Sequence, residues 1–262
     1  MSRNFELLQQ AGIGLPGGFP GRLDGPAVAI PSRNAKVKGE DRAFVASLEP
    51  ADLDRAGREE TLRLVQSVFL LQSPTGKGSV VVFASVDSGS GCSTVCKRAA
   101  RVLAESVPGS VCLVDANFRE TAQVSAFGAS QLGLADALRS SSPIREFAKP
   151  VQRENLWLLS CGSHLDQSVG LLHSDRMKKR VADLREDFDY VLIDAPALNS
   201  YSDGVALGQF ADGLVLILEA NTTRRDATSR IAERLHAMQV QVLGAVLNKR
   251  TFPIPASLYR RL

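Results

Sequence analysis

A chain of 262 residues, 44% of them hydrophobic, is long enough to bury the core of one domain and to leave a flanking segment. The net charge of +3 is too small to indicate a nucleic-acid partner, and no stretch approaches the roughly 18 apolar residues of a membrane span. The first ten residues lack the apolar run of a signal peptide and the four cysteines form no CxxC pair, so we expect a cytoplasmic protein with reduced thiols.

Residues 1–47 are rich in glycine and proline, which predicts a flexible tail that packs little. From about Pro50 the pattern changes, and apolar residues such as Leu62, Val65 and Phe69 recur at helical spacing. We therefore expect residues 48–262 to form a single domain that begins with a helix.

The most informative stretch is Val80–Thr94. Its apolar run, Val80–Val86, predicts a buried strand, and a glycine-rich turn then leads into a helix that opens at Ser93-Thr94. This layout is that of a P-loop, in which backbone N–H groups and a helix N-terminus hold polyphosphate. A P-loop normally ends in Gly-Lys-Ser/Thr, whereas this one reads Gly91-Cys92-Ser93, so a cysteine replaces the lysine that reaches the β- and γ-phosphates.

Strand and helix patterns alternate after the P-loop. The predicted strands are residues 110–115, 156–161, 190–194, 214–218 and 240–247, and the predicted helices lie near 134–138, 172–188 and 227–238. Such alternation predicts an α/β fold, a P-loop NTPase-like and mainly parallel sheet with helices on both faces. Ligands bind at the carboxyl ends of the strands in such sheets, where the P-loop, Asp115 and Asp194 all fall.

Nucleoside triphosphate chemistry needs a backbone cradle, a hydroxyl group and carboxylates for Mg²⁺, and a cation on the phosphates. The chain offers the cradle, the Ser93 hydroxyl and the carboxylates of Asp115 and Asp194, but not the cation. The residues therefore predict a nucleotide site that has lost one component.

From about Glu59 to Leu262 the chain resembles the cytoplasmic P-loop domain of the bacterial tyrosine kinases. These proteins are related to the MinD and ParA ATPases and act with a membrane polysaccharide co-polymerase in capsule and exopolysaccharide export. The resemblance is carried by the Glu60-x-x-Arg63-x-x-Gln66 stretch, the Walker A position at Val86–Thr94, the second motif at Cys112–Arg119, the Walker B at Phe188–Pro196, and Leu243–Asn248.

The resemblance implies a set of site residues. Nucleotide would be held by Ser88, Gly89, Ser90, Gly91, Cys92, Ser93, Thr94 and Asn248, the last near the base. Mg²⁺ would be held by Ser93, Asp115 and Asp194, and in an active enzyme the two aspartates would be catalytic. The helix of Glu60, Arg63 and Gln66 would form a homo-oligomer contact, and the partner would be a membrane polysaccharide co-polymerase or an active kinase homologue at the inner membrane.

Four departures from the family pattern point in one direction. Cys92 replaces the Walker A lysine, Asn117 replaces an aspartate, Gln66 replaces an arginine, and Tyr259 stands where the family often carries a tyrosine cluster. They predict weakened binding of ATP or ADP with Mg²⁺ and lost catalysis, hence a pseudokinase that regulates or scaffolds polysaccharide synthesis.

Two alternatives remain open from the sequence. The first is an active ATP-dependent protein-tyrosine autokinase that takes its lysine from Lys77, Lys97 or Lys249. The second is a ParA/MinD-like positioning ATPase, which the modest charge supports little. Pro253 and Pro255 also argue against a C-terminal membrane helix of the MinD kind.

Overall fold

The computed structural model describes residues 55–70, 78–119, 132–151, 155–162 and 168–250. All of them belong to one compact unit, Lys38–Leu262. The predicted tail, the predicted boundary after residue 47, Lys77 and Tyr259 lie outside the described residues, so these predictions remain untested.

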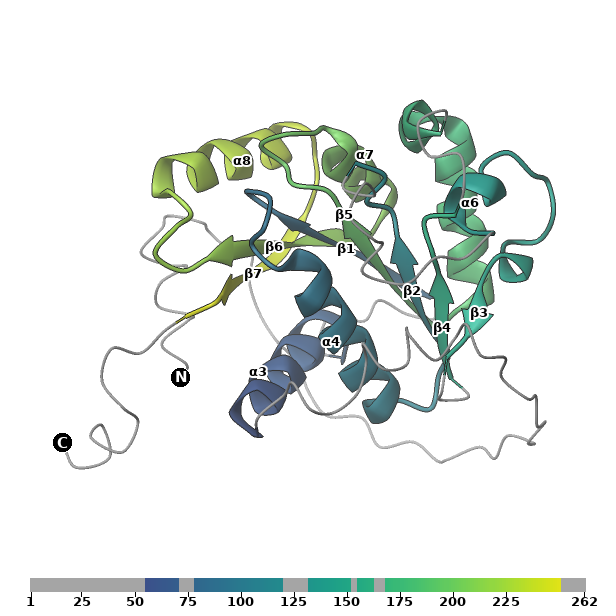
Figure 1. The fold of residues 1–262 in the computed structure, drawn as a ribbon, viewed down its shortest axis with the longest axis horizontal. Coiled ribbons are helices and arrows are strands. Elements are labelled where there is room, and N and C mark those ends of the chain that lie inside the picture. Colours follow the sequence, from purple (N-terminus) through teal and green to yellow (C-terminus); the bar gives the residue numbers. More distant parts are fainter. Residues whose placement is uncertain (1–54, 71–77, 120–131, 152–154, 163–167, 251–262) are drawn as a thin grey trace. The chain divides into compact units, whose positions relative to one another are not determined.

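Seven strands form one sheet in the order β3-β4-β2-β5-β1-β6-β7 (Figure 1). They are β1 (Ser79–Ser85), β2 (Val111–Asp115), β3 (Lys149–Pro150), β4 (Leu156–Leu159), β5 (Tyr190–Ala195), β6 (Gly213–Glu219) and β7 (Val242–Asn248). All neighbouring pairs are parallel except β3 with β4. The predicted mainly parallel sheet is therefore confirmed.

Helices cover both faces of this sheet, as Figure 1 shows. On one face lie α3 (Arg55–Val65), the π-helix η2 (Gln66–Leu70) and α4 (Cys92–Ser106). On the other lie α5 (Leu134–Ala137), the 3₁₀ helices η3 (Ile144–Glu146) and η5 (Val169–His173), α6 (Asp175–Asp187), α7 (Asp203–Phe210) and α8 (Arg225–Ala237). Within the described segments no helix combines the length and the hydropathy that crossing a bilayer requires.

Strand β1 lies in the middle of this arrangement, and all seven of its residues are buried. Val80 and Val82 join the core under the α5–α8 layer, whereas Val81 and Phe83 join the core under α3 and α4. Because alternate side chains of a strand point to opposite faces, a strand covered on both sides reads as a continuous apolar run. This is why Val80–Val86 was recognisable from the sequence.

The helix predicted over residues 172–188 is confirmed for Asp175–Asp187, which form α6, but its predicted start is wrong. Residues before Ser174 form the separate 3₁₀ helix η5, and the Ser174 hydroxyl donates to Leu171 O at 2.6 Å. Helix α7 is not predicted at all, because its first six residues are all buried and leave no polar stripe to reveal a helical period.

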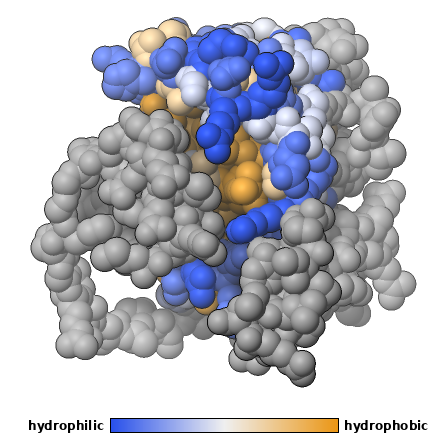
Figure 2. All heavy atoms as spheres, turned by 90° about the vertical axis from the view of Figure 1, so that its left-hand side faces the viewer, coloured by the Kyte–Doolittle hydropathy of each residue, from blue (hydrophilic) through white to orange (hydrophobic). Residues whose placement is uncertain are grey.

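One end of the sheet is formed by β7. Figure 2 looks onto this side of the molecule and shows hydrophobic surface between hydrophilic side chains. Most of β7 is partly buried, and Leu247 near its carboxyl end is 48% exposed. The strand ends at Asn248, which reaches the P-loop described next.

Candidate functional site

Two carboxylates meet at the carboxyl edge of the sheet. Asp115 at the end of β2 is directly opposite Asp194 of β5, and Asp194 is opposite Phe83 of β1. Both aspartates are buried. Leu113 and Leu192, two residues earlier on the same strands, pack under α4, so the period of two places both carboxylates on the α4 side. The sheet thus brings the two strand-end aspartates to the edge where the P-loop begins, as the sequence predicted.

The loop between β1 and α4 depends on two glycines. Gly89 and Gly91 have φ of 81° and 83°, in the left-handed region that glycine adopts without strain. Gly91 is the N-cap of α4, and the N–H groups of the first helical turn have no acceptor within the helix. Such N–H groups, with the positive end of the helix dipole behind them, form an anion site.

Hydrogen bonds within the loop and from distant segments hold it in place. The Ser90 hydroxyl donates to Asp87 O at 2.8 Å, and Asn199 Nδ2 donates to Asp87 Oδ1 at 2.7 Å. Asn248 Nδ2 donates to Ser90 O at 2.8 Å. A Cβ added to Gly91 would lie 2.4 Å from this Asn248 nitrogen, so the close packing of the loop on β7 requires glycine at position 91.

A cavity of about 140 Å³ opens beside the loop. It is lined by Ser85, Gly89, Gly91, Cys92, Ser93, Thr94, Asn117, Ala195 and Ala197. Whole-ligand pockets usually measure about 300–1,000 Å³, so this cavity has the size for a phosphate group. No cationic side chain is among its lining residues in the described part of the chain, and position 92 offers a buried cysteine.

The predicted nucleotide residues divide into two groups. Five line the cavity: Gly89, Gly91, Cys92, Ser93 and Thr94. The other three do not: Ser88 is exposed, the Ser90 hydroxyl turns back into its own loop, and the Asn248 amide is bonded to the loop backbone. Four lining residues were not predicted as site residues, and Ala195 and Ala197 among them carry no chemical signal in the sequence.

The donor set fits Mg²⁺. Ser93 supplies a hydroxyl group at the cavity, and Asp115 and Asp194 supply carboxylates at the same edge. Mg²⁺ is held by one or two carboxylates while water and phosphate oxygens complete its shell, so two are sufficient. No group of three or more His, Cys, Asp or Glu suited to a metal occurs among the described residues, which leaves this pair as the predicted metal site.

Two of the three candidate lysines are described. Lys249 Nζ donates to Gly89 O at 2.7 Å and pairs with Glu219 Oε1 at 3.2 Å. The pKa of Lys97 on α4 lies below its ordinary value, because burial of the ammonium lowers it by more than the charges of Asp194 and Asp115 raise it. Both cations thus lie close to components of the site, and neither lines the cavity.

A second charged cluster lies beside the predicted second motif and α7. The buried Asp203 accepts from Arg119 Nε at 2.8 Å and contacts His173 Nε2 at 2.7 Å. The Arg119 guanidinium also lies 4.8 Å from the centroid of the Tyr201 ring. Burial raises the pKa of Asp203, but hydrogen bonds from Arg119 and His173 outweigh it and hold that pKa below its ordinary value. This carboxylate connects three separate segments of the chain, and no sequence pattern predicts the pairing.

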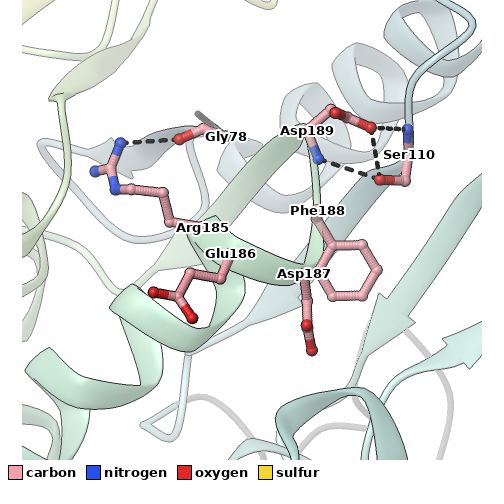
Figure 3. Close-up of a pocket in the computed structure, with 7 residues that line it drawn as sticks. All are labelled: Gly78, Ser110, Arg185, Glu186, Asp187, Phe188 and Asp189. Carbon is pink, nitrogen blue, oxygen red and sulfur yellow. Dashed lines mark hydrogen bonds between the residues drawn. The ribbon is translucent and has the colours of Figure 1, made fainter. Parts of the chain in front are cut away.

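A larger pocket of about 390 Å³ lies at the opposite, amino-end edge of the sheet (Figure 3). Two of its charged side chains, those of Arg185 and Asp189, bond to backbone groups of neighbouring segments. Arg185 donates to Gly78 O at 2.8 Å and Asp189 accepts from the Ser110 amide at 2.7 Å. These bonds connect segments that precede the strands, so we assign the pocket a structural role.

The chain is similar to known proteins at low sequence identity. No family model matches it. It is 26% identical over 208 residues to tyrosine-protein kinase YwqD of Bacillus subtilis (strain 168), covering 79% of this chain and 86% of YwqD. It is 28% identical over 202 residues to the succinoglycan biosynthesis transport protein ExoP of Rhizobium meliloti (strain 1021), covering 76% of this chain and 26% of ExoP. The solved VpsO kinase domain matches with a TM-score of 0.64 and 26% identity, covering 77% of this chain and 100% of that domain.

Proposed function

We propose that this chain, which is similar in sequence to bacterial tyrosine-protein kinases, is a degenerate member of that family. It would regulate or scaffold exopolysaccharide or capsule synthesis without transferring phosphate efficiently. Its partner would be a membrane polysaccharide co-polymerase or an active kinase homologue. The chain would then reach the membrane through that partner.

The observation that carries the proposal is Cys92. It occupies the first position of α4 and lines the phosphate-sized cavity, where the P-loop pattern has lysine. Loss of one charge-assisted hydrogen bond weakens phosphate binding by about 1.5–3 kcal/mol. Phosphoryl transfer suffers more, because the lysine stabilises negative charge that develops in the transition state.

The remaining components support weak nucleotide binding. Ser93, Asp115 and Asp194 would hold Mg²⁺, which neutralises charge on the phosphates when it is bound. The first turn of α4 and the glycine loop would hold the phosphates. Asn117 lines the same cavity with an amide where the family pattern has a carboxylate, which removes a charge for metal binding or acceptor activation.

The role in polysaccharide synthesis is supported by the relatives and by α3. YwqD is named a tyrosine-protein kinase and ExoP a succinoglycan biosynthesis transport protein. Glu60 and Arg63 on α3 and Gln66 at the start of η2 are all exposed, as a subunit-contact or partner-contact surface requires.

The proposal is tested by phosphotransfer. Purified protein is incubated with Mg-ATP, alone and with an excess of a tyrosine-containing acceptor, and phosphotyrosine is measured against an Asp194→Ala variant. We expect the wild type and the variant to give the same background. ATP-dependent tyrosine phosphorylation by the wild type that disappears in Asp194→Ala would overturn the proposal. If Lys97→Met or Lys249→Met, made in the wild-type protein, also abolished that phosphorylation, the result would favour an autokinase with a relocated lysine.

A further inference from the structure

Two consecutive residues at the end of β7 hold the outer side of the P-loop. Asn248 Nδ2 donates to Ser90 O at 2.8 Å, and Lys249 Nζ donates to Gly89 O at 2.7 Å. The donors are adjacent in the chain, and so are the two carbonyls that they bind. The donors lie about 160 residues from the carbonyls in sequence, so these hydrogen bonds exist only in the folded protein.

These two bonds orient the loop's amide groups. A trans peptide is planar, and its N–H points away from its C=O. A carbonyl of Gly89 held toward β7 therefore turns the N–H of Ser90 the opposite way, and a held carbonyl of Ser90 does the same for the N–H of Gly91. Gly89 and Gly91 both line the phosphate-sized cavity, so the restraint acts on the wall of the site.

The loop needs such a restraint because of its glycines. Gly89 and Gly91 carry no Cβ and reach both signs of φ readily, so their peptide groups rotate more easily than those of other residues. A lysine at position 92 would place a cation on bound phosphate and help hold it there, and this chain has cysteine instead. Orienting the loop amides before the phosphate binds therefore contributes more to phosphate affinity here than it does in a P-loop that has its lysine.

Lys249 is itself held in place. Its φ is 56°, a left-handed conformation that costs a non-glycine residue free energy and persists where surrounding contacts impose it. Glu219 Oε1 lies 3.2 Å from Nζ, and Ala220 N donates to Asn248 O at 2.9 Å. The side chain is 48% exposed, so its charge lies at the rim of the loop and outside the core.

We propose that Asn248 and Lys249 form a P-loop clamp, a pair of positioning residues that keeps the loop amides directed at the cavity. The clamp lets the loop bind the diphosphate of a nucleoside diphosphate although Cys92 supplies no cation. Since this role depends on the nucleotide binding proposed above and is independent of phosphate transfer, the two proposals are tested by different measurements.

The clamp is tested by titrating Mg-ADP into the full-length protein by calorimetry. We expect measurable binding by the wild type, a loss of about tenfold in Lys249→Met, and recovery of most of it in Lys249→Arg, whose guanidinium can again donate to Gly89 O. The variant Lys179→Met is the matched control, because it removes the same charge from an exposed position of α6. Asn248→Ala removes the second donor and is expected to lose affinity in the same way.

A second readout separates positioning from folding. Hydrogen exchange of the P-loop amides, measured without nucleotide, should speed up in Lys249→Met while the melting temperature stays near that of Lys179→Met. The clamp is overturned if the wild type does not bind Mg-ADP, if Lys249→Met binds as tightly as the wild type, or if Lys179→Met loses as much. It is also overturned if Lys249→Arg is as weak as Lys249→Met. None of these results affects the proposed absence of phosphotransfer.

Discussion

Replacing Cys92 with lysine should restore a cation to the start of α4 and tighten the binding of Mg-ADP. Cys92 is the first helical residue after Gly91 and lines the cavity beside Ser93. The residue is only 8% exposed, so the lysine stem has to run along the cavity wall with its ammonium toward the phosphates. Long side chains of this kind bury their methylenes and keep the charge at a polar surface.

The gain can be bounded from the contacts. One charge-assisted hydrogen bond to phosphate contributes about 1.5–3 kcal/mol, which corresponds to about 10- to 150-fold in the dissociation constant. One effect reduces it. Asp115 and Asp194 lie at the same edge of the sheet and attract the new ammonium before nucleotide arrives, so part of its electrostatic stabilisation is already present in the free protein. We therefore expect a gain near the lower limit, about tenfold.

The assay is calorimetry with Mg-ADP on the wild type, Cys92→Lys and Cys92→Met. Methionine is an unbranched side chain without charge, so the comparison separates the cation from the added length. The expected order of affinity is Cys92→Lys, then the wild type, with Cys92→Met equal or weaker. Equal affinities for the lysine and methionine variants would refute the reasoning, because the charge at position 92 would then contribute nothing.

Three further substitutions test contacts that stabilise the fold. Asp203→Asn should lower the free energy of unfolding by about 1.5–3 kcal/mol at pH 7. The folded-state pKa of Asp203 lies below its ordinary 3.8, so the carboxylate contributes its full stabilisation above pH 3.8 and loses it as the pH falls through the folded-state pKa. Urea unfolding of the wild type and Asp203→Asn should therefore show a smaller difference in the free energy of unfolding at pH 3 than at pH 7. A difference that is the same at both pH values would contradict the assignment. Gly91→Ala should destabilise the protein by more than about 1 kcal/mol, since Gly91 has φ of 83° and the new Cβ would lie 2.4 Å from Asn248 Nδ2. Gly170→Ala is the control, because a Cβ there meets nothing within 4 Å, and its free energy of unfolding should stay within about 0.5 kcal/mol of the wild-type value in the same urea series. Arg180→Lys should lower stability by about 2–4 kcal/mol, because the buried guanidinium donates to three backbone carbonyls that one ammonium cannot reach together; a melting temperature like that of the wild type would show that these bonds contribute little.

Most of the framework of the site could be predicted from local patterns. The apolar run of β1, the glycines after it and the apolar helix that follows are contiguous in sequence, so they identify a P-loop without any tertiary information. The positions of Asp115 and Asp194 at strand ends also follow from local runs. Their direct pairing across β2 and β5 follows from strand order, which only the sheet shows.

Local patterns failed at two helices, one whose burial removed the helical period and one where the period continued across a break in the helix. Helix α7 is enclosed on nearly all sides, so its residues carry no amphipathic signal. The segment from Val169 to Asp187 keeps apolar residues at helical spacing through Ser174, although the chain there changes from a 3₁₀ to an α-helix. Periodicity records which face is buried and does not record where the backbone hydrogen bonding changes.

The sequence by itself determined the chemistry available at the site: a glycine loop, a hydroxyl group, two strand-end carboxylates, and cysteine at position 92 in place of lysine. Only the tertiary structure decided which distant groups complete it. Lys249 reaches Gly89 because β7 ends beside the P-loop, and Asp203 joins Arg119 to His173 because three segments meet at one edge of the sheet. The physical reason is that the range of a hydrogen bond or an ion pair is a few ångströms in space, whatever the separation along the chain.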